Sequence, residues 1–106
     1  MSKYLIQANY TADGLKGVLA KGGSSRRDVV QSMAAEMGGS LESFYFAFGD
    51  ADAFVVLDMP DNISVAAAAM TVSASGAVSA KTTVLLSPED VDEAAKKSVN
   101  YVPPGS

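Results

Sequence analysis

The sequence predicts one α+β domain in which helices pack against a four-stranded antiparallel sheet. Strand-like and helix-like segments follow one another in the order β-α-β-β-α-β, and a further helix is predicted near the C-terminus. A chain of 106 residues, 48% of them hydrophobic, can bury one core and hardly two. We therefore assign residues 1–100 to the domain and residues 101–106, with their prolines and glycine, to a short tail.

The chain is expected to begin with a strand and a short helical piece. Residues 3–10 place alternating side chains on two faces, which is typical of a strand. Residues 12–21 contain helix-forming side chains together with two glycines, and they stop at a glycine pair. A short helix that breaks at residues 22–23 is therefore predicted.

A longer helix is predicted to follow. Ser24 or Ser25 can cap it, and Ser25 with Asp28 three residues later forms an acidic variant of the capping box. Gly38 and Gly39 end it, since glycine readily adopts the left-handed conformation found after helices. Its buried stripe is expected to consist of Val29, Val30, Met33 and Met37.

A β-hairpin is predicted in the middle of the chain. Residues 41–48 carry four aromatic side chains in five positions, and residues 53–59 are apolar on both faces, so both segments are predicted to be strands. Residues 49–52 contain the glycine and aspartates of a tight connection, and Pro60 ends the second strand.

The last part of the chain is predicted to be helix, strand and helix. Asp61 or Asn62 caps a helix that runs to about residue 74, residues 77–86 form the fourth strand, and Ser87 caps a final helix that ends near Lys97. The buried stripe of the first of these helices is expected to consist of Ile63, Ala66, Ala67, Met70 and Ala74.

This order of elements is the ferredoxin-like plan, in which two helices cover one face of the sheet. A sheet with one solvated face should alternate apolar and polar residues, but residues 44–48 and 53–57 are apolar on both faces. A second copy related by a two-fold axis is the simplest cover. The sequence therefore predicts a homodimer or higher homo-oligomer, a dimeric α+β barrel.

Composition excludes several classes of function. The chain contains no cysteine and no histidine, so disulfides, Cys/His zinc sites and His-dependent nucleophilic mechanisms are excluded, and no metal or cofactor is expected. A net charge of −4 argues against a nucleic-acid partner. The most apolar stretch is interrupted by polar residues, so no membrane association is expected, and the default location is the cytoplasm.

Two polar groups lie at predicted turns or helix ends. Arg26 lies beside Gly22–Ser25 at a helix start, where it could bind a phosphate or carboxylate, or it could be a solvated arginine that pairs with an acid. Asp52, with Asp50, could form a paired-carboxylate site, or both could be turn residues that bond to their own backbone.

Three further candidates lie within predicted strands. Lys81 and Asn9, the latter accompanied by Gln7, either line a small polar pocket or lie at the sheet rim, where the lysine pairs with acids. In a pocket, a desolvated lysine could act as a base or a Schiff-base nucleophile. Tyr45 and its aromatic neighbours could stack on an aromatic ligand, or they could belong to the core or a dimer interface.

A set of short blocks spread over nearly the whole chain carries a resemblance to a known family. The blocks are Lys3-Tyr4-Leu5, Gln7-Ala8, Tyr10-Thr11, Gly14, Lys16-Gly17, Gly22-Gly23, Arg26, Gly38-Gly39, residues 41–49, Asp52, Leu57, Pro60-Asp61-Asn62, residues 72–77, Lys81-Thr82-Thr83 and Pro103-Pro104-Gly105. With them the chain resembles the GYD-domain family of small, mostly bacterial, uncharacterised proteins. One departure falls at the family's Gly-x-Tyr-Asp motif, where Ala51 stands in place of the tyrosine between Gly49 and Asp52. The resemblance implies a ferredoxin-like α+β barrel protomer that associates with itself, and it brings no established activity.

Three functions remain open from the sequence. The first is a homo-oligomer that binds a small ligand or serves as a regulatory or stress-related module. The second is a cofactor-independent enzyme, oxygenase- or isomerase-like, with a pocket between sheet and helices and with Lys81, Tyr45, Asn9 or Asp52 as polar groups. The third is a structural protein that assembles with itself. Fold alone does not choose among them.

Overall fold

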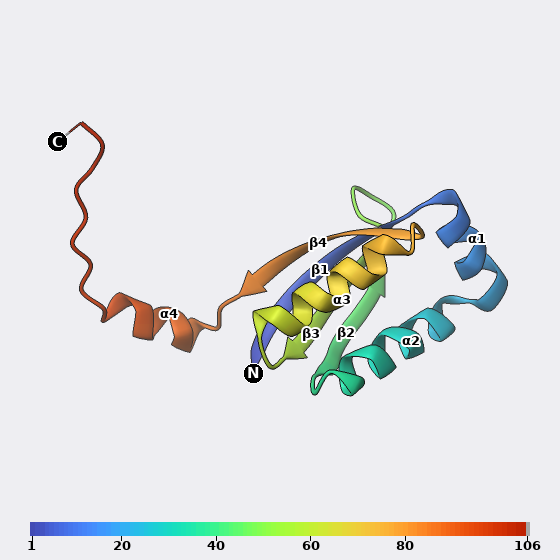
Figure 1. Cartoon of the computed structure of the whole chain (residues 1–106), viewed down its shortest axis with the longest axis horizontal. Helices are drawn as coiled ribbons and strands as arrows, with labels where there is room; N and C mark the ends of the chain where they lie inside the picture. The colour runs from blue at the N-terminus through green and yellow to red at the C-terminus, as the bar shows by residue number, and fades with distance from the viewer. Residues whose placement is uncertain (106) are drawn as a thin grey trace.

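The computed structural model describes residues 1–105 and contains four strands and four helices in that part of the chain (Figure 1). The strands and helices follow one another in the predicted order, and the predicted break lies between the first two helices. Their bounds are β1 Ser2–Tyr10, α1 Ala12–Lys21, α2 Gly23–Glu36, β2 Ser40–Phe46, β3 Ala53–Met59, α3 Asn62–Ala74, β4 Val78–Leu85 and α4 Pro88–Ala95.

The four strands form one antiparallel sheet in the order β2-β3-β1-β4. Helices α2 and α3 lie across one face of this sheet, and the strand order is that of a ferredoxin-like fold (Figure 1). The predicted α+β class and topology are therefore confirmed. None of the helices among residues 1–105 is both long enough and apolar enough to cross a membrane.

The core lies between the sheet and the helices. Tyr4 of β1 and Met59 of β3 are each 1% exposed, and the Tyr4 hydroxyl donates a hydrogen bond to the Asn62 side chain at the start of α3. Ala34 of α2 and Val65 of α3 close the core from the helical side. Together with the smaller cluster around Ala53, these residues hold both helices on one face of the sheet.

The opposite face of the sheet is not covered within one chain by the described residues. Its side chains come from alternate strand positions, among them Leu5 and Gln7 of β1 and Phe54 of β3, which is 38% exposed. We call this surface the open face. The open face mixes polar and apolar side chains more than the sequence suggested. Gln7 pairs across the strands with Lys81 on this face. β3 contributes only every second side chain to it, because the others point to the helices.

The start of α2 differs from the prediction of a serine cap. The helix begins at Gly23, its N-cap is Gly22, and no side chain caps it. Gly22 has a φ of 86°, a conformation that favours glycine. Because this residue turns the chain directly from α1 into α2, Ser24 and Ser25 already lie inside the first turn.

The inward face of α3 also differs from the prediction. Val65 is buried and Val72 packs against the core, whereas Ile63 is 82% and Met70 is 72% exposed. The predicted stripe lies on the outer face of the helix. Nine of the 13 residues of α3 are apolar and they occur all round the helix, so the sequence pattern alone could not distinguish its two faces. The predicted aspartate cap is confirmed, since the Asp61 side chain accepts a hydrogen bond from the Ser64 N–H.

The hairpin between β2 and β3 is confirmed, but its connection is longer than predicted. β2 ends at Phe46, so residues 47–52 form the loop, and Phe48 is fully exposed in it. The sheet register shifts between Leu41 and Ser43, which marks a bulge. Leu41 lies before the bulge and Phe44 lies after it, and both pair with residues of β3 that point to the helices. Both side chains contact the core, so β2 keeps its inward face on either side of the bulge.

Candidate functional site

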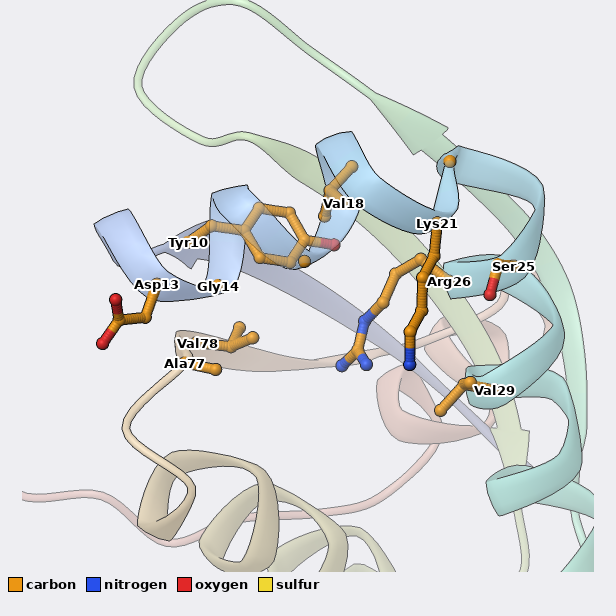
Figure 2. Close-up of a pocket in the computed structure, with 12 residues that line it drawn as sticks. Tyr10, Asp13, Gly14, Val18, Lys21, Ser25, Arg26, Val29, Ala77 and Val78 are labelled. Carbon is orange, nitrogen blue, oxygen red and sulfur yellow. The ribbon is translucent and has the colours of Figure 1, made fainter.

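A cavity of about 270 Å³ lies between α1, α2 and the adjoining ends of β1 and β4 (Figure 2). Tyr10 at the end of β1 lies alongside α1 in this view, with its hydroxyl near Val18, and the basic side chains of Lys21 and Arg26 lie side by side and point in the same direction. Asp13 lies at the other end. We call this cavity the Tyr10–Arg26 cleft, and its volume lies just below the range of about 300–1,000 Å³ that is typical of small-molecule sites.

Contacts between distant parts of the chain build one wall of this cleft. The Thr11 side chain caps α1 by accepting a hydrogen bond from the Gly14 N–H at 3.2 Å. The backbone N–H of Thr11 donates to the Ala77 carbonyl oxygen at 3.0 Å, and the Thr11 hydroxyl reaches the same oxygen at 3.3 Å. Helix α1 is thereby attached to the start of β4, 66 residues further along the chain.

The electrostatic character of the cleft is positive at the α2 end. Arg26 is half-buried and forms no ion pair with the described residues, whereas its neighbour Arg27 contacts Asp28 at 3.5 Å. Burial raises the pKa of the Tyr10 phenol above its ordinary value of 10.0, and the positive charge of Arg26 acts in the opposite direction. The phenol is therefore protonated at neutral pH and can donate a hydrogen bond.

A second, smaller cavity of about 70 Å³ shares Tyr10, Arg26 and Val78 with the first. It lies between α2, α3 and the inward face of the sheet. Apart from Tyr10 and Arg26, every residue that lines it is apolar, as Ile6 and Phe44 are. The shared residues therefore place a guanidinium and a phenol at the boundary between a mixed cavity and an apolar one.

Of the five residues predicted as ligand-binding candidates, Arg26 is the one that lines this cleft. Asp52 lies in the loop before β3, where its carboxylate accepts a hydrogen bond from the Tyr10 N–H at 2.9 Å and its own N–H donates to the Ala8 carbonyl oxygen. These bonds attach the loop before β3 to the end of β1, 42 residues away, rather than to the loop's own backbone. Ala51, at the position of the family's tyrosine, is 3% exposed.

The other three candidates lie on the open face, opposite to Arg26. Tyr45, Phe54, Gln7 and Lys81 form one row across the four strands, and Asn9 pairs with Ser79 one step further along β1. Three strand spacings of about 4.8 Å separate the ends of this row, so Tyr45 and Lys81 cannot act on one small group in a single chain. Lys81 is also exposed and lacks the burial expected of a Schiff-base lysine.

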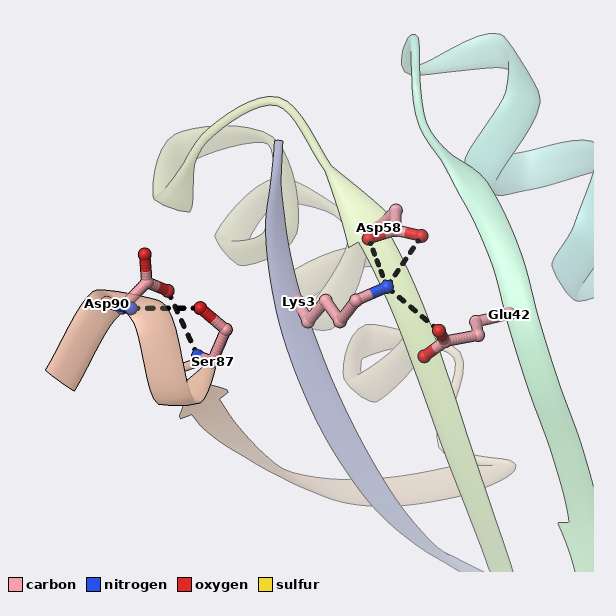
Figure 3. Close-up of polar contacts among 5 residues, drawn as sticks. All are labelled: Lys3, Glu42, Asp58, Ser87 and Asp90. Carbon is pink, nitrogen blue, oxygen red and sulfur yellow. Dashed lines mark hydrogen bonds and ion pairs between the residues drawn. The ribbon is translucent and has the colours of Figure 1, made fainter. Parts of the chain in front are cut away.

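The open face carries an ion cluster that the sequence did not single out. The Lys3 ammonium contacts Glu42 at 2.8 Å and Asp58 at 3.0 Å (Figure 3). Hydrogen bonds to these carboxylates, that to Glu42 foremost, raise the pKa of Lys3 above 10.5. Because the three side chains come from β1, β2 and β3, the cluster ties three strands together and shows no unpaired cation for a ligand.

Sequence reasoning missed Tyr10, Lys21 and Asp13 as cleft residues. Tyr10 looked like an ordinary strand residue, and Lys21 like a helix-terminal base. Lys21 had one signal, its position beside the Gly22–Gly23 break, because a tight helix–helix connection folds the end of α1 back against the start of α2. Tyr10 and Asp13 lie before α1 and in its first turn, and they had no such signal. Among residues 1–105, no group of three or more acidic side chains is placed to hold a metal ion.

Comparison with known proteins places the chain in a family without adding an activity. Searches of curated proteins and of solved structures found no significant match. A family model described as the GYD domain matches residues 4–95, from within β1 to the end of α4. The chain therefore belongs to the GYD domain family.

Proposed function

We propose that this protein is a homo-oligomeric ligand-binding protein whose Tyr10–Arg26 cleft takes a small amphipathic organic anion. The observation that carries the proposal is the position of Arg26, which has no acidic partner among the described residues and lies where a mixed cavity meets an apolar one. An arginine without a carboxylate partner can bind the carboxylate or phosphate of a ligand through two parallel hydrogen bonds.

The other groups of the cleft fit the same ligand class. Lys21 adds a second positive charge beside Arg26, and the Tyr10 hydroxyl can donate to an anionic oxygen. The apolar part of the ligand would replace water against Ile6, Val30 and the other apolar residues that line the smaller cavity. A fully polar anion would gain nothing from this second cavity, so an amphipathic ligand is favoured over an inorganic one.

Binding of alkyl carboxylates of increasing length, compared with the matching alcohols, tests this proposal by calorimetry. We expect carboxylates to bind more tightly than alcohols, and affinity to increase with chain length until the apolar cavity is filled. Arg26→Gln should weaken carboxylate binding about 10- to 100-fold, because hydrogen bonds to charged groups contribute about 1.5–3 kcal/mol. Arg27→Gln is the matched control, since Arg27 does not line the cleft.

Two results would contradict the proposal. One is equal binding of carboxylates and alcohols, which would remove the role of the cation. The other is equal weakening by Arg26→Gln and Arg27→Gln, which would show that general surface charge attracts the anion. Native mass spectrometry of the protein as purified adds an independent readout, because it reports a retained ligand by its mass.

The homo-oligomer is supported by the open face. Leu5, Val56 and Phe54 form its apolar centre, and the polar ends of the face are formed by the Lys3 cluster and by Asn9. A second copy related by a two-fold axis would cover this centre with the same residues of its own sheet. Phe54→Glu should then reduce the oligomeric mass measured by light scattering, and an unchanged mass would exclude this face as the interface.

A further inference from the structure

The C-terminal arm, residues 86–105, extends away from the rest of the protein (Figure 1). It contains α4 and the tail, and no residue of α4 is buried. The radius of gyration of 16.9 Å exceeds the value of about 13 Å expected for a compact chain of this length. The arm accounts for the difference, since it extends one end of a molecule 57 Å long.

An isolated helix such as α4 is not stable by itself. It has eight residues, and helices shorter than about 12–15 residues are marginal in water. Its start is well formed: the Ser87 side chain accepts a hydrogen bond from the Asp90 N–H, and the Asp90 carboxylate accepts one from the Ser87 N–H (Figure 3). A cap of this kind contributes about 1 kcal/mol, so the helix also needs a packing surface.

The arm has the side chains of a packing element. Val91 is 52% exposed, Tyr101 is 71% exposed, and Leu86 and Val99 are exposed with them. α4 also carries four acidic residues and no basic residue, so the surface that receives it should combine apolar and basic groups. The four acids are Glu89, Asp90, Asp92 and Glu93.

Such a surface lies on α1. Leu15 is 48% and Leu19 is 79% exposed, and one helical turn places them side by side. Lys16 lies next to them in sequence, and Lys21 ends the same helix. Leu15, Lys16 and Leu19 do not line the Tyr10–Arg26 cleft, whereas Lys21 does, so this surface adjoins the proposed ligand site at Lys21.

The arm cannot reach this surface within its own chain. α1 and α4 lie at opposite ends of the long axis of the molecule (Figure 1). A two-fold axis perpendicular to the strands places the arm end of one copy beside the α1 end of the other, and the exchange is then closed and reciprocal. This symmetry also allows the two open faces to meet.

We infer that the C-terminal arm packs on α1 of a second copy of this chain, with Val91 against Leu15 and Leu19 and the acids of α4 beside Lys16 and Lys21. The inference does not depend on the ligand proposed above. It adds a reciprocal arm exchange to the contact between open faces, and it gives an exposed, well-capped helix the surface that its sequence requires.

Isotope-mixed cross-linking tests which molecule the arm contacts. Unlabelled and ¹⁵N-labelled full-length protein are unfolded together, refolded and treated with a zero-length reagent that joins carboxylates to amines. We expect peptides of α4 joined to Lys16 or Lys21 in pairs of mixed isotope. Cross-links of a single isotope composition, or none between α4 and α1, would overturn the inference.

Substitutions test the contact energetically in the full-length chain. Val91→Asp should raise the dimer dissociation constant at least about tenfold, since burial of a valine contributes more than a factor of ten. Ser98→Asp, which adds the same charge without removing an apolar side chain, is the control. Because no residue of α4 is buried in its own protomer, neither change should lower the stability of the protomer.

A charge exchange gives the second readout. Lys16→Glu should weaken association about two- to fivefold, and Glu89→Lys with Glu93→Lys in the same chain should restore it. Association that is unchanged by Val91→Asp, or a charge exchange that restores nothing, would refute the arm contact. A protein that is monomeric at all concentrations would refute it as well.

Discussion

Replacing Gly14 by alanine should separate α1 from the sheet. A Cβ atom at this position would overlap the carbonyl oxygen of Ala77, which belongs to the backbone and cannot rotate away. The same oxygen accepts both hydrogen bonds from Thr11 that attach α1 to the start of β4. The substitution therefore acts on the contact that attaches the start of α1 to β4, on one wall of the cleft.

The magnitude follows from comparison with Gly17, which lies on the same helix and has open space around its Cβ position. Both glycines gain about 0.5–1 kcal/mol of helix propensity when replaced by alanine. No residue of α1 is buried, so α1 can move away from Ala77 at the cost of the Thr11 bonds, about 0.5–1.5 kcal/mol each. The two variants should therefore differ by about 1–3 kcal/mol.

Thermal and urea unfolding followed by circular dichroism measure this difference. Gly17→Ala should be more stable than the wild type, and Gly14→Ala should melt at least about 4 °C below Gly17→Ala, since 1 kcal/mol shifts the midpoint of a domain of this size by about that much or more. Gly14→Ala that is as stable as Gly17→Ala would refute the docking of α1 on Ala77 and, with it, the shape of the cleft.

Two further predictions concern the core and the helix caps. Met59→Ala should lower the free energy of unfolding by about 2–5 kcal/mol in a urea titration, because Met59 is 1% exposed. Met70→Ala, at a position that is 72% exposed, should change it by less than about 0.5 kcal/mol. Similar losses for the two variants would show that α3 packs differently. The hydrogen bond from the Ser64 backbone lowers the pKa of Asp61 below 3.8, so its stabilisation is present above that pH and is lost as the pH falls through the folded value. Asp61→Asn keeps an acceptor that does not titrate, so the advantage of the wild type in melting temperature should shrink below about pH 4, and a difference that is independent of pH would contradict this role.

The order of elements could be predicted because each boundary has a local chemical cause. Ser87 and Pro88 define the start of α4, Asp61 caps α3, and the glycines after α2 end it. These signals act within a few residues and need no knowledge of the tertiary structure. The topology then follows from the order of elements, because few arrangements of this order are allowed.

Orientation of the elements could not be predicted in the same way. α3 is apolar almost all round, so its inward face is decided by which side chains fit the sheet: Val65 and Val72 face inward, and Ile63 does not. The strands presented the same difficulty, because β3 is apolar on both sides. As a result the sequence grouped Arg26 with residues such as Tyr45, which the fold places on the opposite face of the sheet.

The cleft itself depends on contacts that no local pattern encodes. Tyr10 and Arg26 are separated by the whole of α1, and they meet because Gly22 folds α2 back beside α1 while Ala77 holds the start of α1 in place. Each of these residues has an ordinary local role as a strand end, a helix break or a turn. Arg26 becomes a candidate ligand-binding group because this arrangement gives it an apolar cavity on one side and, among residues 1–105, no acid to pair with. It follows that Gly14→Ala, which leaves Arg26 unchanged, should also weaken carboxylate binding, whereas Gly17→Ala should weaken it less.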